Sequence, residues 1–115
     1  MSRFPEDDLQ MQVAEYLDSL GVLWCHVANE RRTSPQAGVR LKKKGVKSGV
    51  PDVMIFEPRG VWSGLAIELK VGKNKPTKTQ EHWLSGLHEN FWDVSVCYTY
   101  EETKYCIDDL SLIHI

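Results

Sequence analysis

Long hydrophobic runs are missing from this sequence. It has 115 residues, of which 42% are apolar and 26% charged, and no apolar run approaches the roughly 18–20 residues that span a bilayer. The N-terminal MSRFPEDDLQ has no apolar core of the kind found in signal peptides. No repeat or linker divides the chain. We therefore expect one domain, residues 1–115, located in the cytoplasm.

Cysteine and histidine patterns typical of metal sites are also missing. The cysteines, Cys25, Cys97 and Cys106, are odd in number and have no paired spacing. They are expected to be reduced and mostly buried. None of the four histidines forms an i, i+4 pair, which argues against a helical zinc site.

Acidic residues are absent from residues 31–47, although the whole chain has a net charge of −2. This segment carries seven bases: Arg31, Arg32, Arg40, Lys42, Lys43, Lys44 and Lys47. A second basic segment contains Lys73, Lys75 and Lys78. Composition alone is compatible with solvated loops or with a surface that contacts phosphates.

Periodicity predicts a mixed α/β fold. A helix is expected from Pro5 to a stop at Gly21, and a second helix from about residue 78 to residue 89. Strands are expected at 22–27, 53–56, 65–69 and 94–100, with a short one at 104–107. Residues 29–49 are expected to form a long loop. This order indicates a mixed β-sheet flanked by α-helices.

The segment PDVMIFEPRGVWSGLAIELK, residues 51–70, contains two of these strands with charges at both ends. If the strands form a hairpin about Gly60, opposite residues have numbers that sum to 120, so Asp52 faces Glu68. Lys70 then shares a face with Glu68. Paired carboxylates repel unless a shared proton or a divalent cation offsets the charge. The alternative is an ordinary Glu68–Lys70 ion pair, with Asp52 capping a turn.

The same residues resemble the PD-(D/E)xK nuclease signature, here Pro51-Asp52 followed by Glu68-Leu69-Lys70. The surrounding segments HVANERR, GVKSGVPDVMIF and AIELKVGKNKPTKTQ are similar to the VRR-NUC (virus-type replication-repair nuclease) branch of that superfamily. The similarity runs from the first helix through the strand at 94–100, and the length suits compact stand-alone members from phages and bacteria. It implies a restriction-endonuclease-like core.

The resemblance also implies roles for individual residues. Asp52 and Glu68 would bind Mg²⁺ or Mn²⁺ together with the backbone carbonyl of Leu69, and Lys70 would be the catalytic lysine.

Two further residues are implied by position. Gln80 lies where the family keeps a glutamine in the helix after the ELK strand. Thr77-x-x-Gln80 is also a capping-box pattern, so a structural role is the alternative. Glu15 occupies the place of the first-helix glutamate that reaches the metal site. Its alternative is a solvated acid on the flank of the helix.

These inferences predict a metal-dependent nuclease that hydrolyses phosphodiester bonds in DNA. The small size favours a homodimer, for which residues 110–115 are a candidate interface, acting on branched DNA such as a four-way junction or flap in repair, recombination or phage replication. The two basic segments would contact phosphates. The competing prediction is a non-catalytic nucleic-acid-binding module. A glycosidase fits less well, because bases beside the acids suit phosphates better than sugars.

Overall fold

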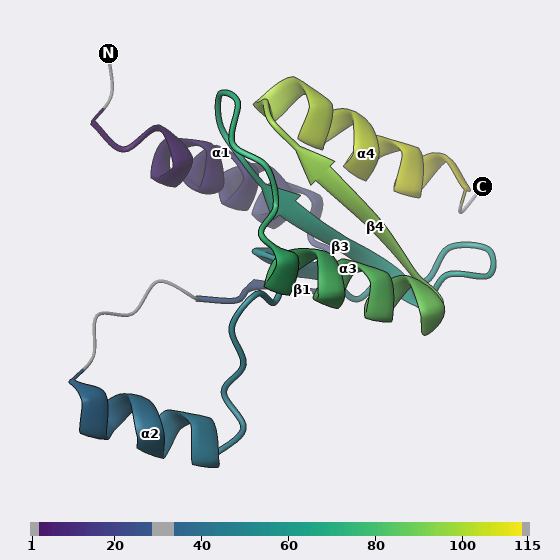
Figure 1. Cartoon of the computed structure of the whole chain (residues 1–115). Helices are drawn as coiled ribbons and strands as arrows, with labels where there is room; N and C mark the ends of the chain where they lie inside the picture. The colour runs from purple at the N-terminus through teal and green to yellow at the C-terminus, as the bar shows by residue number, and fades with distance from the viewer. Residues whose placement is uncertain (1–2, 29–33, 114–115) are drawn as a thin grey trace.

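The computed structural model describes residues 3–28 and 34–113 (Figure 1). Along the chain run α1 (Pro5–Leu20), β1 (Trp24–His26), α2 (Pro35–Lys43), β2 (Val53–Ile55), β3 (Gly64–Leu69), α3 (Lys78–Glu89), β4 (Trp92–Cys97) and α4 (Tyr100–Ile113). The four strands form one sheet in the order β1-β2-β3-β4, with β1, β2 and β3 antiparallel and β4 parallel to β3. The predicted mixed sheet flanked by helices is confirmed. No helix within the described ranges is long and apolar enough to cross a membrane.

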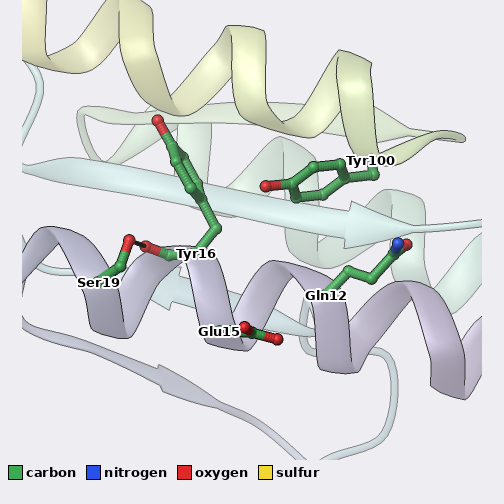
Figure 2. Close-up of a pocket in the computed structure, with 5 residues that line it drawn as sticks. All are labelled: Gln12, Glu15, Tyr16, Ser19 and Tyr100. Carbon is green, nitrogen blue, oxygen red and sulfur yellow. Dashed lines mark hydrogen bonds between the residues drawn. The ribbon is translucent and has the colours of Figure 1, made fainter.

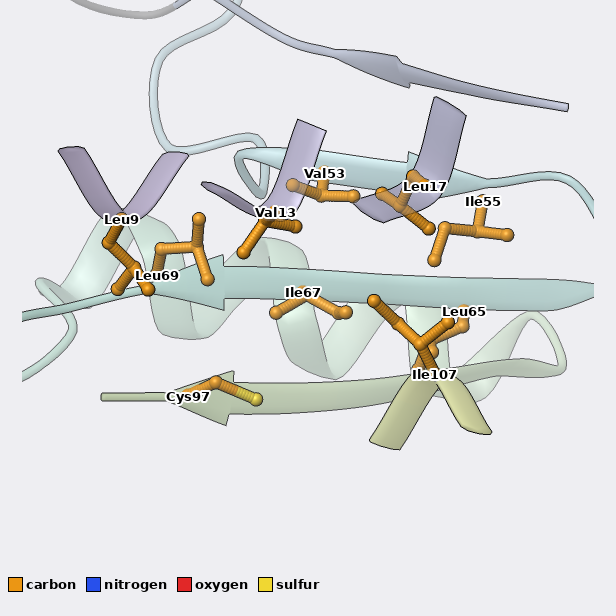
Figure 3. Close-up of a cluster of buried hydrophobic side chains, with 10 residues drawn as sticks. All are labelled: Leu9, Val13, Leu17, Val53, Ile55, Leu65, Ile67, Leu69, Cys97 and Ile107. Atoms are coloured by element: carbon orange, nitrogen blue, oxygen red, sulfur yellow. The ribbon is translucent and has the colours of Figure 1, made fainter. Parts of the chain in front are cut away.

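The hydrophobic core lies on one face of the sheet (Figure 3). Leu9, Val13 and Leu17 of α1 cover this face, and all three are buried. The odd-numbered strand residues Val53, Ile55, Leu65, Ile67 and Leu69, with Cys97 and Ile107, complete the cluster. Side chains alternate along a strand, so the even-numbered residues of β2 and β3 point to the opposite face, where α3 packs.

The predicted boundaries of α1 and α3 agree with the structure because their end signals are local. Pro5 opens α1, acidic residues occupy its first turn, and Gly21 closes it in the left-handed conformation at φ 71°. Thr77 caps the start of α3.

Residues 29–49 are not one long loop, because they contain the helix α2. Ser34 caps this helix by accepting a hydrogen bond from the backbone N–H of Ala37 at 3.2 Å, and Pro35 is its first residue. Ser-Pro is a recognisable helix start, but the scarcity of apolar residues concealed it. None of the residues of α2 is buried, and Figure 1 shows the helix standing away from the sheet.

The strand predicted at 104–107 is wrong, because these residues lie within α4. The Thr99 side chain accepts a hydrogen bond from the Glu102 backbone N–H at 3.1 Å, in the manner of a helix cap. Thr103 and Ile107 are buried while Tyr105 between them is 75% exposed, which is the helical period, since a strand would place all three on one face. All three cysteines are free thiols, with Cys97 buried, Cys106 half-buried and Cys25 exposed.

The predicted hairpin register is confirmed. Val53 pairs with Ile67, Met54 with Ala66 and Ile55 with Leu65, so each pair sums to 120. Gly60 adopts a positive φ of 54° in the connection between the strands, a conformation that glycine adopts without strain. This register brings the two ends of the PD…ELK segment together where the central strands β2 and β3 meet the same end of the sheet.

Candidate active site

The acids and the lysine of the PD…ELK segment meet where the hairpin strands end. The Oδ2 atom of Asp52 accepts a hydrogen bond from the Leu69 backbone N–H at 2.8 Å, and Lys70 Nζ lies 3.8 Å from Glu68 Oε2. Asp52, Glu68 and Lys70 are 7%, 2% and 9% exposed respectively. The Glu68–Lys70 contact is therefore buried and differs from the ordinary surface ion pair that the sequence also allowed.

Gln80 forms the predicted capping box and also contacts Glu68. Its side-chain Oε1 accepts from the Thr77 backbone N–H at 2.8 Å, and its own backbone N–H donates to Thr77 Oγ1 at 3.2 Å, which completes the capping box. The other end of the same amide, Nε2, donates to Glu68 Oε2 at 3.1 Å. The helix cap and the contact with the site are thus made by opposite atoms of one side chain.

Glycine is required where the chain approaches the site from α2. Gly49 has a φ of 86°, and a Cβ atom there would lie 2.6–2.8 Å from Thr79 at the start of α3. No larger residue fits this approach without displacing the backbone of α3. The close passage places Pro51 and Asp52 beside the helix that carries Gln80.

The electrostatics of the site centre on Glu68. Burial raises the pKa of its carboxyl group from 4.5 to about 8, and the neighbouring charge of Asp52 adds to the increase. Lys70 acts in the opposite direction, while Glu6 of α1 raises the pKa further. Glu68 Oε1 is buried and has no hydrogen-bond partner among the described residues. Without a cation the site therefore favours the protonated form of Glu68, and the unpartnered Oε1 is an oxygen that a bound cation could use.

A small hollow of about 20 Å³ opens beside Asp52. It is lined by Glu6, Asp7, Gln10, His26, Asp52 and Leu69. The His26 ring Nδ1 lies 2.8 Å from the Asp52 backbone oxygen, which also accepts from the Val27 N–H at 2.9 Å. A carbonyl oxygen only accepts, so Nδ1 of His26 carries the proton. Strand β1 therefore fixes the backbone of Asp52 at the rim of the hollow.

Glu15 does not lie at this hollow. Its exposed side chain lines a different pocket, of about 330 Å³, together with Gln12, Tyr16, Ser19 and Tyr100 (Figure 2). The first-helix glutamate at the hollow is Glu6. Each helical residue advances about 100°, so Glu15 lies about 200° around α1 from the buried Val13, whereas Glu6 is one turn before Leu9 on the covered face. The structure therefore does not bring Glu15 to Asp52, and the acid of α1 that lies there is Glu6.

Sequence reasoning thus missed Glu6, Gln10 and His26. The signal for Glu6 was its i, i+3, i+7 spacing with Leu9 and Val13, which places an acid in line with the buried stripe. Acidic residues in the first turn also stabilise a helix through its dipole. Because this structural explanation is sufficient, the position of Glu6 at the site was not predicted.

The pair Glu6 and Glu15 allows a direct test of this placement. Replacing Glu6 with glutamine is expected to lower DNA cleavage roughly 10- to 100-fold, because it removes a charge beside Asp52 and Glu68. The same replacement at Glu15 is expected to leave the rate within about twofold, since exposed side chains away from a site tolerate change. Initial rates on labelled DNA at equal protein concentration measure both. A larger loss in the Glu15 variant would reverse the assignment.

The predicted DNA-contacting bases occupy exposed positions on two segments. Arg40, Lys42 and Lys43 form the last turn of α2, and Lys44 and Lys47 follow it. Lys73 and Lys75 lie between β3 and α3, and Lys78 opens α3. Arg31 and Arg32 lie outside the described residues. Both described segments are joined directly to the site, one leading into Asp52 and the other leaving Lys70.

Two buried acids and a lysine at the edge of a mixed sheet, with helices on both faces, define a nuclease-like α/β core. The chain matches the VRR-NUC domain family over residues 5–100 and belongs to that family, whose function is of the nuclease type. No curated protein matches it.

Solved structures share the fold. One described as "VRR_NUC domain protein" has a TM-score of 0.76 at 24% identity, covering 98% of this chain and 93% of that chain. Another, described as "VRR_NUC domain", has a TM-score of 0.59 at 23% identity, covering 90% and 94% respectively.

Proposed function

We propose that this protein is a metal-dependent deoxyribonuclease that hydrolyses phosphodiester bonds. The observation that carries the proposal is the convergence of Asp52, Glu68, Lys70 and Gln80 at the end of the hairpin. Asp52 accepts from the Leu69 N–H, and both Gln80 and Lys70 approach Glu68 Oε2. The family supports nuclease activity, and the basic segments on either side suit a polyanionic substrate.

The donor set fits a divalent cation. Asp52 and Glu68 would hold Mg²⁺ or Mn²⁺ with the backbone carbonyl of Leu69, and Glu6 would add charge nearby. The unpaired, buried Oε1 of Glu68 is an oxygen that lacks a partner and suits such an ion. No group of three or more acidic, histidine or cysteine side chains lies within metal-binding reach in the described ranges. A bound ion would polarise the scissile phosphate and lower the pKa of a water molecule.

The remaining residues act through position and charge. Lys70 carries its ammonium group 3.8 Å from Glu68 Oε2, where it can stabilise negative charge that develops on the phosphoryl group. Gln80 orients Glu68 by donating to the same oxygen. Gln80 lies in the first turn of α3 and Lys70 directly follows β3, so both side chains are positioned by regular elements before substrate arrives.

DNA binding is proposed to depend on the exposed bases of α2. Replacing Arg40, Lys42 and Lys43 together with alanine is expected to weaken binding at low salt and to reduce the slope of log affinity against log salt. The reduction should reach up to about 3, because each phosphate that the protein no longer neutralises removes roughly 0.9 from the slope. Fluorescence anisotropy with a labelled duplex over a salt series measures this.

The control for α2 is Lys104→Ala, a basic residue on α4 whose ammonium group lies 5.3 Å from the centre of the Tyr16 ring. The control is expected to leave the slope unchanged. Equal slopes for the triple variant and the wild type would show that these three residues of α2 do not contact DNA phosphates.

Branched DNA and a homodimer remain part of the proposal. One small domain carries one cutting site, and two copies would bring two sites to a symmetric four-way junction. Flap DNA is the other candidate substrate. Light scattering at micromolar concentration tests the dimer, and a strict monomer would remove the argument for symmetric junctions.

The experiment that tests the function compares labelled duplex, flap, splayed and four-way-junction DNA with Mg²⁺, with Mn²⁺ and with EDTA. Metal-dependent cutting with a preference for a branched substrate is expected. Cutting that persists in EDTA would exclude the metal mechanism. Binding without cutting in either metal would favour the alternative, a non-catalytic binding module.

A further inference from the structure

Gln10 of α1 presents a buried donor that meets no acceptor among residues 3–28 and 34–113. Its side-chain Nε2 is inaccessible to solvent and has no hydrogen-bond partner in the part of the chain that the structure describes. Leaving a buried amide unpaired is costly, roughly 1–3 kcal/mol in proteins. Such an atom in a native fold therefore points to a partner other than the protein chain.

The hollow beside Asp52 provides the place for that partner. Gln10 lines it together with Asp52, and its volume is about 20 Å³. A cavity needs roughly 10–15 Å³ to hold one water, which typically makes about three hydrogen bonds. The hollow thus has room for one water molecule. Its lining also contains three acidic residues, Glu6, Asp7 and Asp52, whose oxygens can accept hydrogen bonds from that water.

We propose that Gln10 is a positioning residue for the nuclease reaction, holding a water molecule in this hollow beside Asp52. The inference rests on the proposed function and adds a residue to it. The amide Nε2 donates to the water oxygen, and acidic oxygens of the lining accept its hydrogens. This arrangement fixes the direction of the water's lone pairs, which an acidic pocket without a neutral donor would leave free to rotate.

Helix α1 contains a second glutamine, Gln12, which lies at a different pocket from Gln10. Glu6 and Gln10 are four residues apart and line the same hollow, as i, i+4 neighbours do. Gln12 is exposed and lines the other pocket, between α1 and α4 (Figure 2). Gln12 is therefore a matched control with the same side chain on the same helix.

The test compares Gln10→Met, Gln10→Glu and Gln12→Met. Methionine keeps the length of glutamine and removes the donor. We expect Gln10→Met to lower kcat about 10- to 100-fold, with KM for DNA within about twofold, as misplacement of a reacting group does. Gln10→Glu keeps the shape of the side chain but replaces the donor with an acceptor. Its kcat is therefore expected to stay below that of the wild type, as in Gln10→Met. Gln12→Met is expected to leave the rate unchanged.

Two further measurements, thermal stability and a crystal structure, do not depend on DNA cleavage. In the absence of metal, the Tm of Gln10→Met is expected to fall by no more than about 8 °C, because the substitution removes one hydrogen bond to a water molecule and leaves the protein contacts in place. A high-resolution crystal structure of the wild type is expected to show a water within hydrogen-bond distance of Gln10 Nε2.

The outcomes separate this inference from the proposed function. If the wild type cuts DNA but Gln10→Met cuts equally well, the inference is overturned and the function stands. A dry hollow, or a rate loss explained by a lower Tm, also overturns it. If the wild type fails to cut with either metal, the function fails, and the crystal structure still decides whether Gln10 holds a water.

Discussion

Replacing Asp52 with asparagine is expected to lower DNA cleavage by about a thousandfold or more, because the change removes one of the two carboxylates proposed to bind the metal. Asparagine has nearly the same shape, and its side-chain oxygen can still accept the hydrogen bond from the Leu69 N–H, which is 2.8 Å long in the wild type. The fold is therefore expected to survive. Single-turnover rates with saturating protein, together with calorimetric titration of Mn²⁺, measure the loss of chemistry and of metal affinity separately.

A suitable control for this variant is Asp93→Asn. Asp93 also accepts a charged hydrogen bond, from the largely buried Arg59, but it lies on β4 and outside the hollow lined by Asp52. This variant is expected to lower stability by weakening a buried ion pair while retaining cleavage below its Tm. Wild-type cutting by Asp52→Asn would exclude Asp52 as a metal ligand.

Replacing Glu68 with glutamine is expected to separate stability from activity. Without metal, Glu68 is a buried acid beside Asp52, and its Oε1 has no hydrogen-bond partner in the part of the chain that the structure describes. Glutamine removes that charge and keeps an oxygen to accept from Gln80 Nε2. Because burial and Asp52 outweigh Lys70 and raise the pKa of Glu68, the ionised carboxylate destabilises the metal-free fold, and the variant should be more stable than the wild type by about 1–3 kcal/mol at pH 8. The variant should nevertheless not cut DNA or gain stability from Mn²⁺.

The stability difference should depend on pH in a defined direction. The pKa of Glu68 is raised from 4.5 to about 8 in the folded protein, so the folded state binds the proton more tightly than the unfolded state. The wild type therefore loses stability as pH rises between these values, and glutamine does not. In EDTA the two proteins should be nearly equal near pH 4.5 and diverge towards pH 8.

Denaturant unfolding at several pH values measures this divergence. Glu81→Gln, at an exposed glutamate on α3, serves as the control and is expected to change stability by no more than about 0.5 kcal/mol at any pH. A Glu68 variant that is less stable than the wild type at pH 8 would show that the carboxylate stabilises the metal-free fold.

The hairpin and the limits of α1 and α3 could be predicted because short-range rules determine them. Period-two alternation about Gly60 left one register that buries Val53, Ile55 and Ile67 together, and a one-residue slip would have turned all three to the other face. Cap residues at Thr77 and Gly21 set the helix ends. Since the register was predictable, the meeting of Asp52 with Glu68 and Lys70 was predictable too.

The remaining features depend on contacts between distant segments. Residues 104–107 combine polar and apolar side chains in a way that suits a strand, and their helical state is favoured by packing of Thr103 and Ile107 into the fold. Which acid of α1 reaches Asp52 depends on how far the helix extends beyond the sheet edge. The family resemblance implied Glu15, although the apolar stripe of α1 puts that residue on the flank of the helix, and the structure places Glu6 at the hollow beside Asp52.

The shared amide of Gln80 has a consequence for motion at the site. Its Oε1 belongs to the capping box of α3 and its Nε2 holds Glu68, so fraying of the first turn of α3 and release of the carboxylate are one event. Helix ends open far more often than helix centres. Amide hydrogen exchange at Thr77 and Gln80, whose N–H groups donate within the capping box, would therefore report how tightly Glu68 is held, and ligands that immobilise Glu68 should slow it.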